Sequence, residues 1–143
     1  MNMTKFYEHH GEVRTLAARI ESQLDAGRIA AAPADIAGDV VKLFGKFSVH
    51  LTIEDQALYP RLAQNPNAEV RRMANAFQSE MGGLKGRFDA YRTAWPGPVA
   101  IAKDPARFIQ ETRTVLALLK TRIDREDKQL YPLAELSNAA API

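Results

Sequence analysis

The stretch HLTIEDQALYP, residues 50–60, occurs a second time in the chain as RIDREDKQLYP, residues 122–132. Both copies contain Glu-Asp-x-x-Leu-Tyr-Pro, but Arg122 stands in the second copy where His50 stands in the first. In each copy this position precedes the glutamate by four residues, so on a helix the two side chains share one face. The repeat therefore predicts two related helical units, of which only the first pairs an imidazole with a carboxylate.

Apolar residues recur at three- and four-residue steps along four parts of the chain, which is typical of amphipathic helices. The helices are expected over residues 4–26, 33–64, 68–95 and 104–136. Their connections are short or modest, and no stretch is a convincing strand. The sequence therefore predicts an all-α protein, an up-down-up-down four-helix bundle of two pseudo-repeated helix pairs over residues 1–136. Residues 137–143 are expected to form a flexible C-terminal tail.

Two local signals predict irregular helix geometry. Pro60 lies near the end of the second helix, which predicts a kink or a tightened last turn. Gly82, Gly83 and Gly86 lie close together in the third helix, and each is unfavourable in a helix interior. These glycines predict local unwinding, a bend, close approach by another chain, or a break of the helix into two pieces.

Composition excludes several kinds of site and partner. The 143 residues include 19 basic and 17 acidic side chains, and this near balance does not favour nucleic acid or an acidic membrane as the main partner. The chain has no cysteine, so a bound metal would need nitrogen and oxygen ligands. The first residues lack the apolar core of a signal peptide, and no apolar stretch approaches a membrane span. We therefore expect a soluble, cytoplasmic protein.

A candidate metal site emerges when the helices are placed side by side. His10 lies on the apolar stripe of the first helix, 40 residues before His50 (50 − 10), and Met81 lies 41 residues before Arg122 (122 − 81). Two histidines from facing helices, with Glu54 one turn after the second, make a three-ligand arrangement that suits iron, manganese or zinc. The alternative interpretation is that His10 is an ordinary core histidine and that His50 and Glu54 are an ordinary helix pair.

The quoted phrases resemble the hemerythrin-like family, also called HHE cation-binding domains. The resemblance rests on His10 with Val13 and Arg14, on both copies of the Glu-Asp-x-x-Leu-Tyr-Pro phrase, and covers the chain to about residue 136. It implies a four-helix bundle in which histidines from all four helices and two carboxylates hold two iron ions. Such domains bind oxygen, sense it or handle other small oxidants. The positions that match the family's metal ligands are His10, His50, Glu54 and Glu126.

Two positions depart from the family pattern. Where the family has histidines on the third and fourth helices, this chain has Met81 and Arg122. A guanidinium stays charged and cannot act as a ligand, and at about 4 Å from a divalent ion it would be repelled by about 8 kcal/mol at an effective dielectric of about 20. Arg122 and Met81 are therefore expected to block the second ion's place. Arg122 is further expected to substitute for that ion by a forked ion pair with Glu126 and Glu54, or else to turn to solvent.

Other polar and aromatic residues receive smaller roles. His9 is expected at the rim of the site, and Trp95 in the core. Tyr59 and Tyr131 recur with the repeat and are expected to pack the end of the bundle, with their hydroxyls on polar partners. Asp127, like its counterpart in the first copy, is expected to cap a loop or hold a basic side chain. No nucleophile, phosphate loop or redox pair is recognisable, so no enzymatic activity is expected.

Three functions remain open from the sequence. The first is a diverged hemerythrin-like protein without a complete di-iron centre, acting as a regulatory or protein-interaction module with a protein partner or a second copy of itself. The second is a sensor, store or carrier that holds one iron-like cation on His10, His50, Glu54 and Glu126. A di-iron protein that binds or activates oxygen fits least well, because it needs two metals. The expected cofactor is therefore either none or a single iron-like cation.

Overall fold

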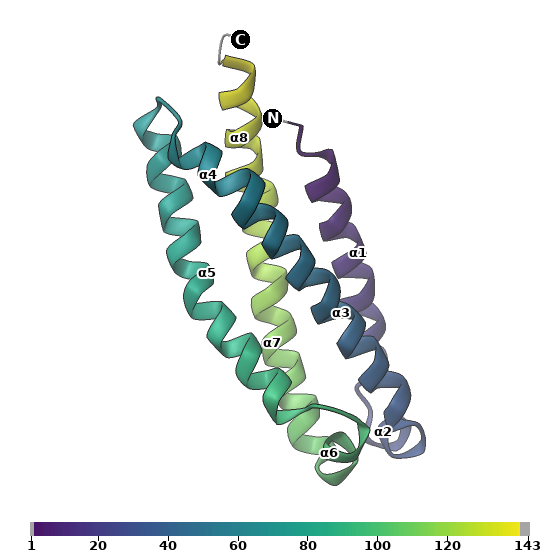
Figure 1. Ribbon diagram of the computed structural model, residues 1–143. Helices are drawn as coiled ribbons and strands as arrows, with labels where there is room; N and C mark the ends of the chain where they lie inside the picture. Colours follow the sequence, from purple (N-terminus) through teal and green to yellow (C-terminus); the bar gives the residue numbers. More distant parts are fainter. Residues whose placement is uncertain (1, 141–143) are drawn as a thin grey trace.

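The structure is a computed structural model that describes residues 2–140, with side chains over residues 2–136. Four long helical segments lie alongside one another as a helical bundle (Figure 1). They consist of α1 (Thr4–Glu21); the continuous run of α3 (Pro33–Ile53), η1 (Glu54–Leu58) and α4 (Tyr59–Ala63); α5 (Ala68–Ala94); and the continuous run of α7 (Pro105–Arg125), η2 (Glu126–Leu130) and α8 (Tyr131–Ala140). The prediction of an all-α protein is confirmed, since residues 2–140 contain no strand.

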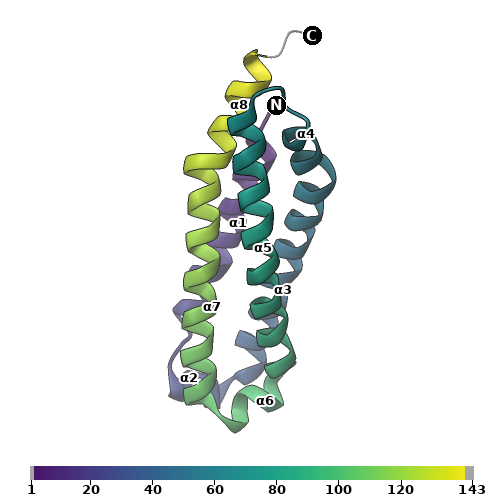
Figure 2. The same cartoon turned by 90° about the vertical axis from the view of Figure 1, so that its left-hand side faces the viewer.

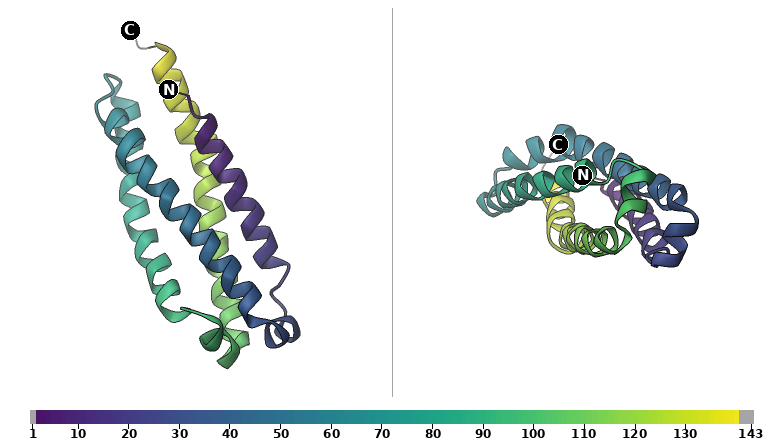
Figure 3. Two further views of the ribbon diagram at one scale, coloured as in Figure 1. Left: turned by 45° about the vertical axis from the view of Figure 1, so that its right-hand side comes forward. Right: turned by 90° about the horizontal axis from the view of Figure 1, so that it is seen from below.

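Two short helices close one end of the molecule. α2 (Ala26–Ala31) and α6 (Pro98–Lys103) lie together at the end opposite the start of α1 and the end of α8 (Figure 2). Seen along its length, the bundle places its long segments around a common interior (Figure 3). Within the part of the chain that the structure describes, every helix is too short or too polar to span a bilayer.

Two helix ends differ from the sequence prediction. The first helix ends at Glu21 rather than near residue 26, because Asp25 adopts extended backbone angles and its side chain caps a new helix, α2, by accepting a hydrogen bond from the Arg28 amide. The last helix continues to Ala140, so the first four residues of the expected tail are helical. The remaining three, 141–143, lie outside the described residues.

Both copies of the repeated phrase form a π-helical turn. In η1 the backbone N–H of Tyr59 donates to the carbonyl of Glu54, five residues earlier, and in η2 Tyr131 donates to Glu126 in the same way. Of the two alternatives expected at Pro60, the tightened last turn is therefore wrong, because the turn is wider than an α-helical one. A wider turn accommodates the following proline, which lacks a backbone N–H and whose ring crowds the carbonyl four residues earlier.

The third helix is continuous through its glycines. α5 runs unbroken from Ala68 to Ala94, so the expected unwinding or break is wrong. Gly82, Gly83 and Gly86 are exposed, and a methyl group built at any of them would meet no atom within 4 Å. These glycines are therefore not required for close packing within the chain.

The interior has a buried polar layer between two apolar clusters. The first apolar cluster includes Val13, Phe47 and Ile123 and lies in the halves of the long segments nearer α2 and α6. It also includes Trp95, as expected. The second apolar cluster includes Phe6, Phe77 and the two tyrosines of the repeat and lies in the opposite half of the bundle. Between them lies the buried polar layer, which we define as His10, His50, Glu54, Arg122 and Glu126. Each of its members is 1% exposed or less.

Candidate metal centre

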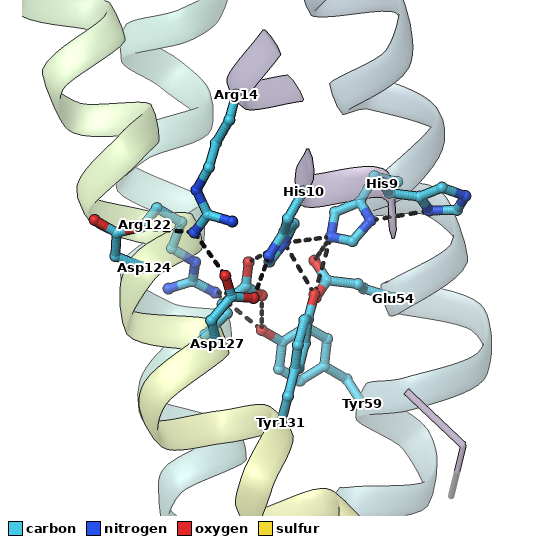
Figure 4. Close-up of polar contacts among 11 residues, drawn as sticks. His9, His10, Arg14, Glu54, Tyr59, Arg122, Asp124, Asp127 and Tyr131 are labelled. Atoms are coloured by element: carbon cyan, nitrogen blue, oxygen red, sulfur yellow. Dashed lines mark hydrogen bonds and ion pairs between the residues drawn. The ribbon is translucent and has the colours of Figure 1, made fainter. Parts of the chain in front are cut away.

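Two imidazoles face each other in the middle of the buried polar layer (Figure 4). Nε2 of His10, from α1, lies 3.0 Å from Nε2 of His50, from α3. A carboxylate approaches each ring: Glu126 Oε1 lies 3.4 Å from His10 Nε2, and Glu54 Oε1 lies 3.3 Å from His50 Nε2. The ligand atoms of His10, His50 and Glu126 all lie within 4.8 Å of one another. The structure therefore brings together the four residues that the sequence proposes as ligands, with Glu54 at the edge of the closest group.

The π-helical turns explain how each copy of the phrase presents two polar groups to this layer. On an α-helix, a residue five positions after another lies about 140° round the axis, so the glutamate and the tyrosine would face different directions. The wider turn reduces this difference, and Glu54 and Tyr59 are both buried, as are Glu126 and Tyr131.

In each copy of the repeat, the tyrosine hydroxyl donates a hydrogen bond to the glutamate of the other copy. Tyr131 donates to Glu54 Oε2 at 2.7 Å, and its hydroxyl also lies 3.0 Å from His50 Nε2 and 3.1 Å from His10 Nε2. Tyr59 donates to Glu126 Oε2 at 3.5 Å. Both rings pack in the second apolar cluster, and the hydroxyls reach polar partners as predicted. The contact of the Tyr131 hydroxyl with both histidines was not predicted. The only related signal in the sequence is that the tyrosine follows the glutamate at the same spacing in both copies of the repeat.

Outer partners orient both imidazoles. His10 Nδ1 lies 2.6 Å from Asp127 Oδ1, and Arg14 holds this carboxylate by donating to its other oxygen at 2.6 Å. Because a carboxylate accepts, Nδ1 carries the hydrogen, and the ring presents its Nε2 lone pair to the cluster when it is neutral. His9 is half-buried at the rim, as expected, with its Nδ1 3.3 Å from His50 Nδ1. The contact of Asp127 with His10 was missed, since the two residues are 117 positions apart.

Arg122 points into the bundle, so the alternative that it turns to solvent is wrong. It is 1% exposed, and its guanidinium stacks on Phe77 with 4.7 Å between Cζ and the ring centroid. The forked ion pair is absent: Nη2 donates to the Tyr59 hydroxyl at 2.9 Å and lies 3.9 Å from Glu126 Oε2, while Nε and Nη1 have no hydrogen-bond partner. The Arg122 guanidinium contacts Tyr59 and Phe77 instead of forming a fork with the two glutamates.

Met81 does not join the buried polar layer. It is half-buried, packs against the first apolar cluster and lines a groove of about 320 Å³ between α3 and α5. The expectation that Met81 converges with the ligand residues is therefore wrong. An unbranched thioether fills the space beside the apolar side chains of that cluster.

A sequence model of the hemerythrin HHE cation-binding domain matches residues 2–134, almost the whole chain. The chain belongs to this family. The resemblance inferred from the repeated phrase is thereby confirmed. No curated protein and no solved structure gives a significant match to this HHE domain.

The electrostatics of this HHE domain favour a neutral His50 and a Glu126 that gives up its proton near neutral pH. Burial, and then the charge of His10, lowers the pKa of His50 to about 4. Burial raises the pKa of Glu126 to about 7, partly offset by its contact with His10. Burial acts to lower the pKa of His10, but the negative charges of Glu126, 3.4 Å from Nε2, and of Asp127, 2.6 Å from Nδ1, outweigh it, so this pKa is raised.

The residues present fit one cation. Glu54 Oε1 and Glu126 Oε1 are buried without a hydrogen-bond donor, and these are the oxygens that face the two imidazole nitrogens. Two ligands of one ion, each about 2.0–2.2 Å from it, lie about 2.8–3.6 Å apart for bond angles between square and tetrahedral. The nitrogen–nitrogen and nitrogen–oxygen distances of 3.0, 3.3 and 3.4 Å fall in this range. On the other side of Glu126, the buried guanidinium of Arg122 leaves a second cation without matching ligands.

Proposed function

We propose that this HHE domain holds a single iron-like cation in the buried polar layer. Its ligands would be the imidazoles of His10 and His50 and the carboxylate of Glu126, with Glu54 beside them. The observation that carries the proposal is the pair of unpartnered carboxylate oxygens, each facing an imidazole Nε2 at 3.3 or 3.4 Å. When bound, an iron ion would supply redox chemistry that the side chains lack.

The second half of the repeat supports one ion rather than two. The two oxygens of Glu126 have different neighbours: Oε1 faces His10, and Oε2 faces the Arg122 guanidinium at 3.9 Å. The guanidinium would thus supply, on one side of the carboxylate, the positive charge that a second ion supplies in a di-iron centre.

We further infer that the fold is an up-down-up-down bundle of two helix pairs, since both copies carry a π-helical turn and a tyrosine that reaches the other copy's glutamate.

The proposed role is binding, as a sensor or store of the cation, and not catalysis. A second candidate is a metal-free regulatory or protein-interaction module. One observation favours it: the Tyr131 hydroxyl, by donating to Glu54 at 2.7 Å and lying beside both imidazoles, partly satisfies the polar layer without an ion.

Elemental analysis after expression in iron-supplied medium tests the proposal. About one metal ion per chain is expected, with loss of that ion in His50→Ala. A matched control is Asp55→Ala, which changes an exposed acidic residue next to Glu54 and should leave the metal content unchanged. Two ions per chain would overturn the single-ion proposal. No metal in the wild-type protein, under conditions that load other iron proteins, would favour the metal-free module.

A further inference from the structure

Three donor atoms form a nearly equilateral triangle in the buried polar layer. The Tyr131 hydroxyl oxygen lies 3.0 Å from His50 Nε2 and 3.1 Å from His10 Nε2, and the two nitrogens lie 3.0 Å apart (Figure 4). Tyr131 is fully buried and its ring stacks on His10 with 5.1 Å between centroids. The hydroxyl is therefore held at the candidate site by packing and is as close to each imidazole as the imidazoles are to each other.

Hydrogen bonds do not account for this triangle when the His10 ring is neutral, which is the form that binds a cation. The single hydroxyl hydrogen of Tyr131 is donated to Glu54 Oε2 at 2.7 Å, so toward the imidazoles the oxygen presents lone pairs. His10 gives the hydrogen on its Nδ1 to Asp127, so its neutral ring also presents a lone pair at Nε2. The contact of 3.1 Å between these two atoms then joins two acceptors. A cation shared by the three atoms would make all three contacts favourable.

We propose that Tyr131 is a ligand of the cation, through its phenolate oxygen, and that the site thereby selects a hard trivalent ion, Fe(III). This inference rests on the proposed function, and adds to it the fourth donor and the oxidation state. An anionic oxygen suits a hard cation better than a soft one. Together with the carboxylates of Glu54 and Glu126, a phenolate would give the ion three anionic oxygen donors, of which Glu126 also faces the Arg122 guanidinium at 3.9 Å.

The proton of Tyr131 has a defined acceptor. When the oxygen–metal bond forms, the oxygen–hydrogen bond breaks, and the proton passes to Glu54 Oε2, the atom that already accepts it, and then to solvent. Without a cation the hydroxyl keeps its proton, which it donates to Glu54 Oε2 at 2.7 Å. A bound cation reverses this preference, because it stabilises the phenolate directly. Loading with the ion is therefore coupled to release of the phenolic proton.

Tyr59 is the matched control, because it holds the same place in the other copy of the repeat. Its hydroxyl accepts from Arg122 Nη2 at 2.9 Å and donates to Glu126 Oε2 at 3.5 Å. The neighbour of Tyr59 is therefore Arg122, whereas the neighbour of Tyr131 is His50. A guanidinium cannot share a cation with the neighbouring oxygen, so Tyr59 is not expected to bind the ion.

The test combines iron content with visible and resonance Raman spectra. Wild-type protein is loaded with Fe(III) as ferric citrate, freed of excess iron and compared with Tyr131→Phe and Tyr59→Phe. Wild type and Tyr59→Phe should bind one iron per chain and show a phenolate-to-Fe(III) charge-transfer band in the visible region, with phenolate ring vibrations in the Raman spectrum. Tyr131→Phe should retain iron on the remaining ligands and lose the band and these vibrations.

Two results separate failure of this inference from failure of the proposed function. Bound iron without the band in wild type, or a band that persists in Tyr131→Phe, overturns the role of Tyr131 and leaves the cation site standing. Absence of iron in wild type overturns both. Should Tyr131→Phe fail to fold, Ga(III) loading of the wild-type protein decides the question: an ultraviolet difference spectrum of one phenolate per ion is expected, and none refutes the proposal.

Discussion

Replacing Asp127 by alanine should weaken cation binding although Asp127 is not one of the proposed ligands. Its carboxylate lies 2.6 Å from His10 Nδ1, its side chain is only 18% exposed, and Arg14 holds its second oxygen at 2.6 Å. The contact fixes the ring orientation and the tautomer in which Nε2 faces the cluster. Loss of such an outer partner weakens metal binding by about 10- to 100-fold, or about 1.4–2.7 kcal/mol.

Competition with a coloured chelator at fixed pH measures this change as a ratio of dissociation constants. Asp127→Asn keeps an oxygen that accepts from Nδ1 and should therefore lose less affinity than Asp127→Ala. Asp55→Ala removes the corresponding acidic residue of the first copy, which is exposed, and should bind as the wild type does. Equal affinity of Asp127→Ala and wild type, or an equal loss in Asp55→Ala, would refute the claim that Asp127 orients His10.

Three further outcomes are expected. Because a methyl group at Gly83 or Gly86 meets no atom within 4 Å, changing either to alanine should raise the free energy of unfolding by about 0.5–1 kcal/mol in urea titrations; a decrease would refute the finding that these positions have room for a side chain. Since the pKa of Glu126 is raised to about 7 and the ion requires its carboxylate form, protons compete below that pH. Cation affinity measured by calorimetry should then rise from about pH 6 to about pH 8 with release of protons, more steeply in the wild type than in Glu126→Gln, and equal slopes in the two proteins would exclude Glu126 as a ligand. Arg122→His should raise the metal content above that of the wild type, because it removes the buried guanidinium and places an imidazole one turn before Glu126; an unchanged content would refute the claim that Arg122 excludes a second ion.

The helices and the repeat are readable from the sequence because they depend on residues that are near one another along the chain. Apolar spacing and boundary residues such as Asn67 and Asp104, whose side chains cap α5 and α7 in the structure, suffice to place long helices. The π-helical turns were not predicted, because the apolar pattern gives no sign of the extra residue in the turn before each proline. The glycines of α5 misled the prediction, since helix propensity is outweighed when the opposite face of the helix packs in the core.

The residues of the candidate site were likewise only partly predictable from the sequence. His10, His50, Glu54 and Glu126 could be named from the repeat, since a spacing of four places two side chains on one face of a helix. The partners of those residues could not. Asp127 reaches His10 across 117 positions, and Tyr131 reaches Glu54 across 77, and no spacing rule connects such residues.

By itself, the sequence determined where the four long helical segments form, which of their faces are apolar, and that one half of the repeat keeps the family's ligand residues while the other carries Arg122 and Met81. Only the tertiary structure decided that Arg122 lies inward on Phe77 without a fork, that Met81 stays out of the buried polar layer, and that Tyr131 joins the two histidines. The physical reason is that periodicity sets direction around one helix axis. Contacts between helices depend on their relative rotation and height, which here are set by core packing and by two π-helical turns.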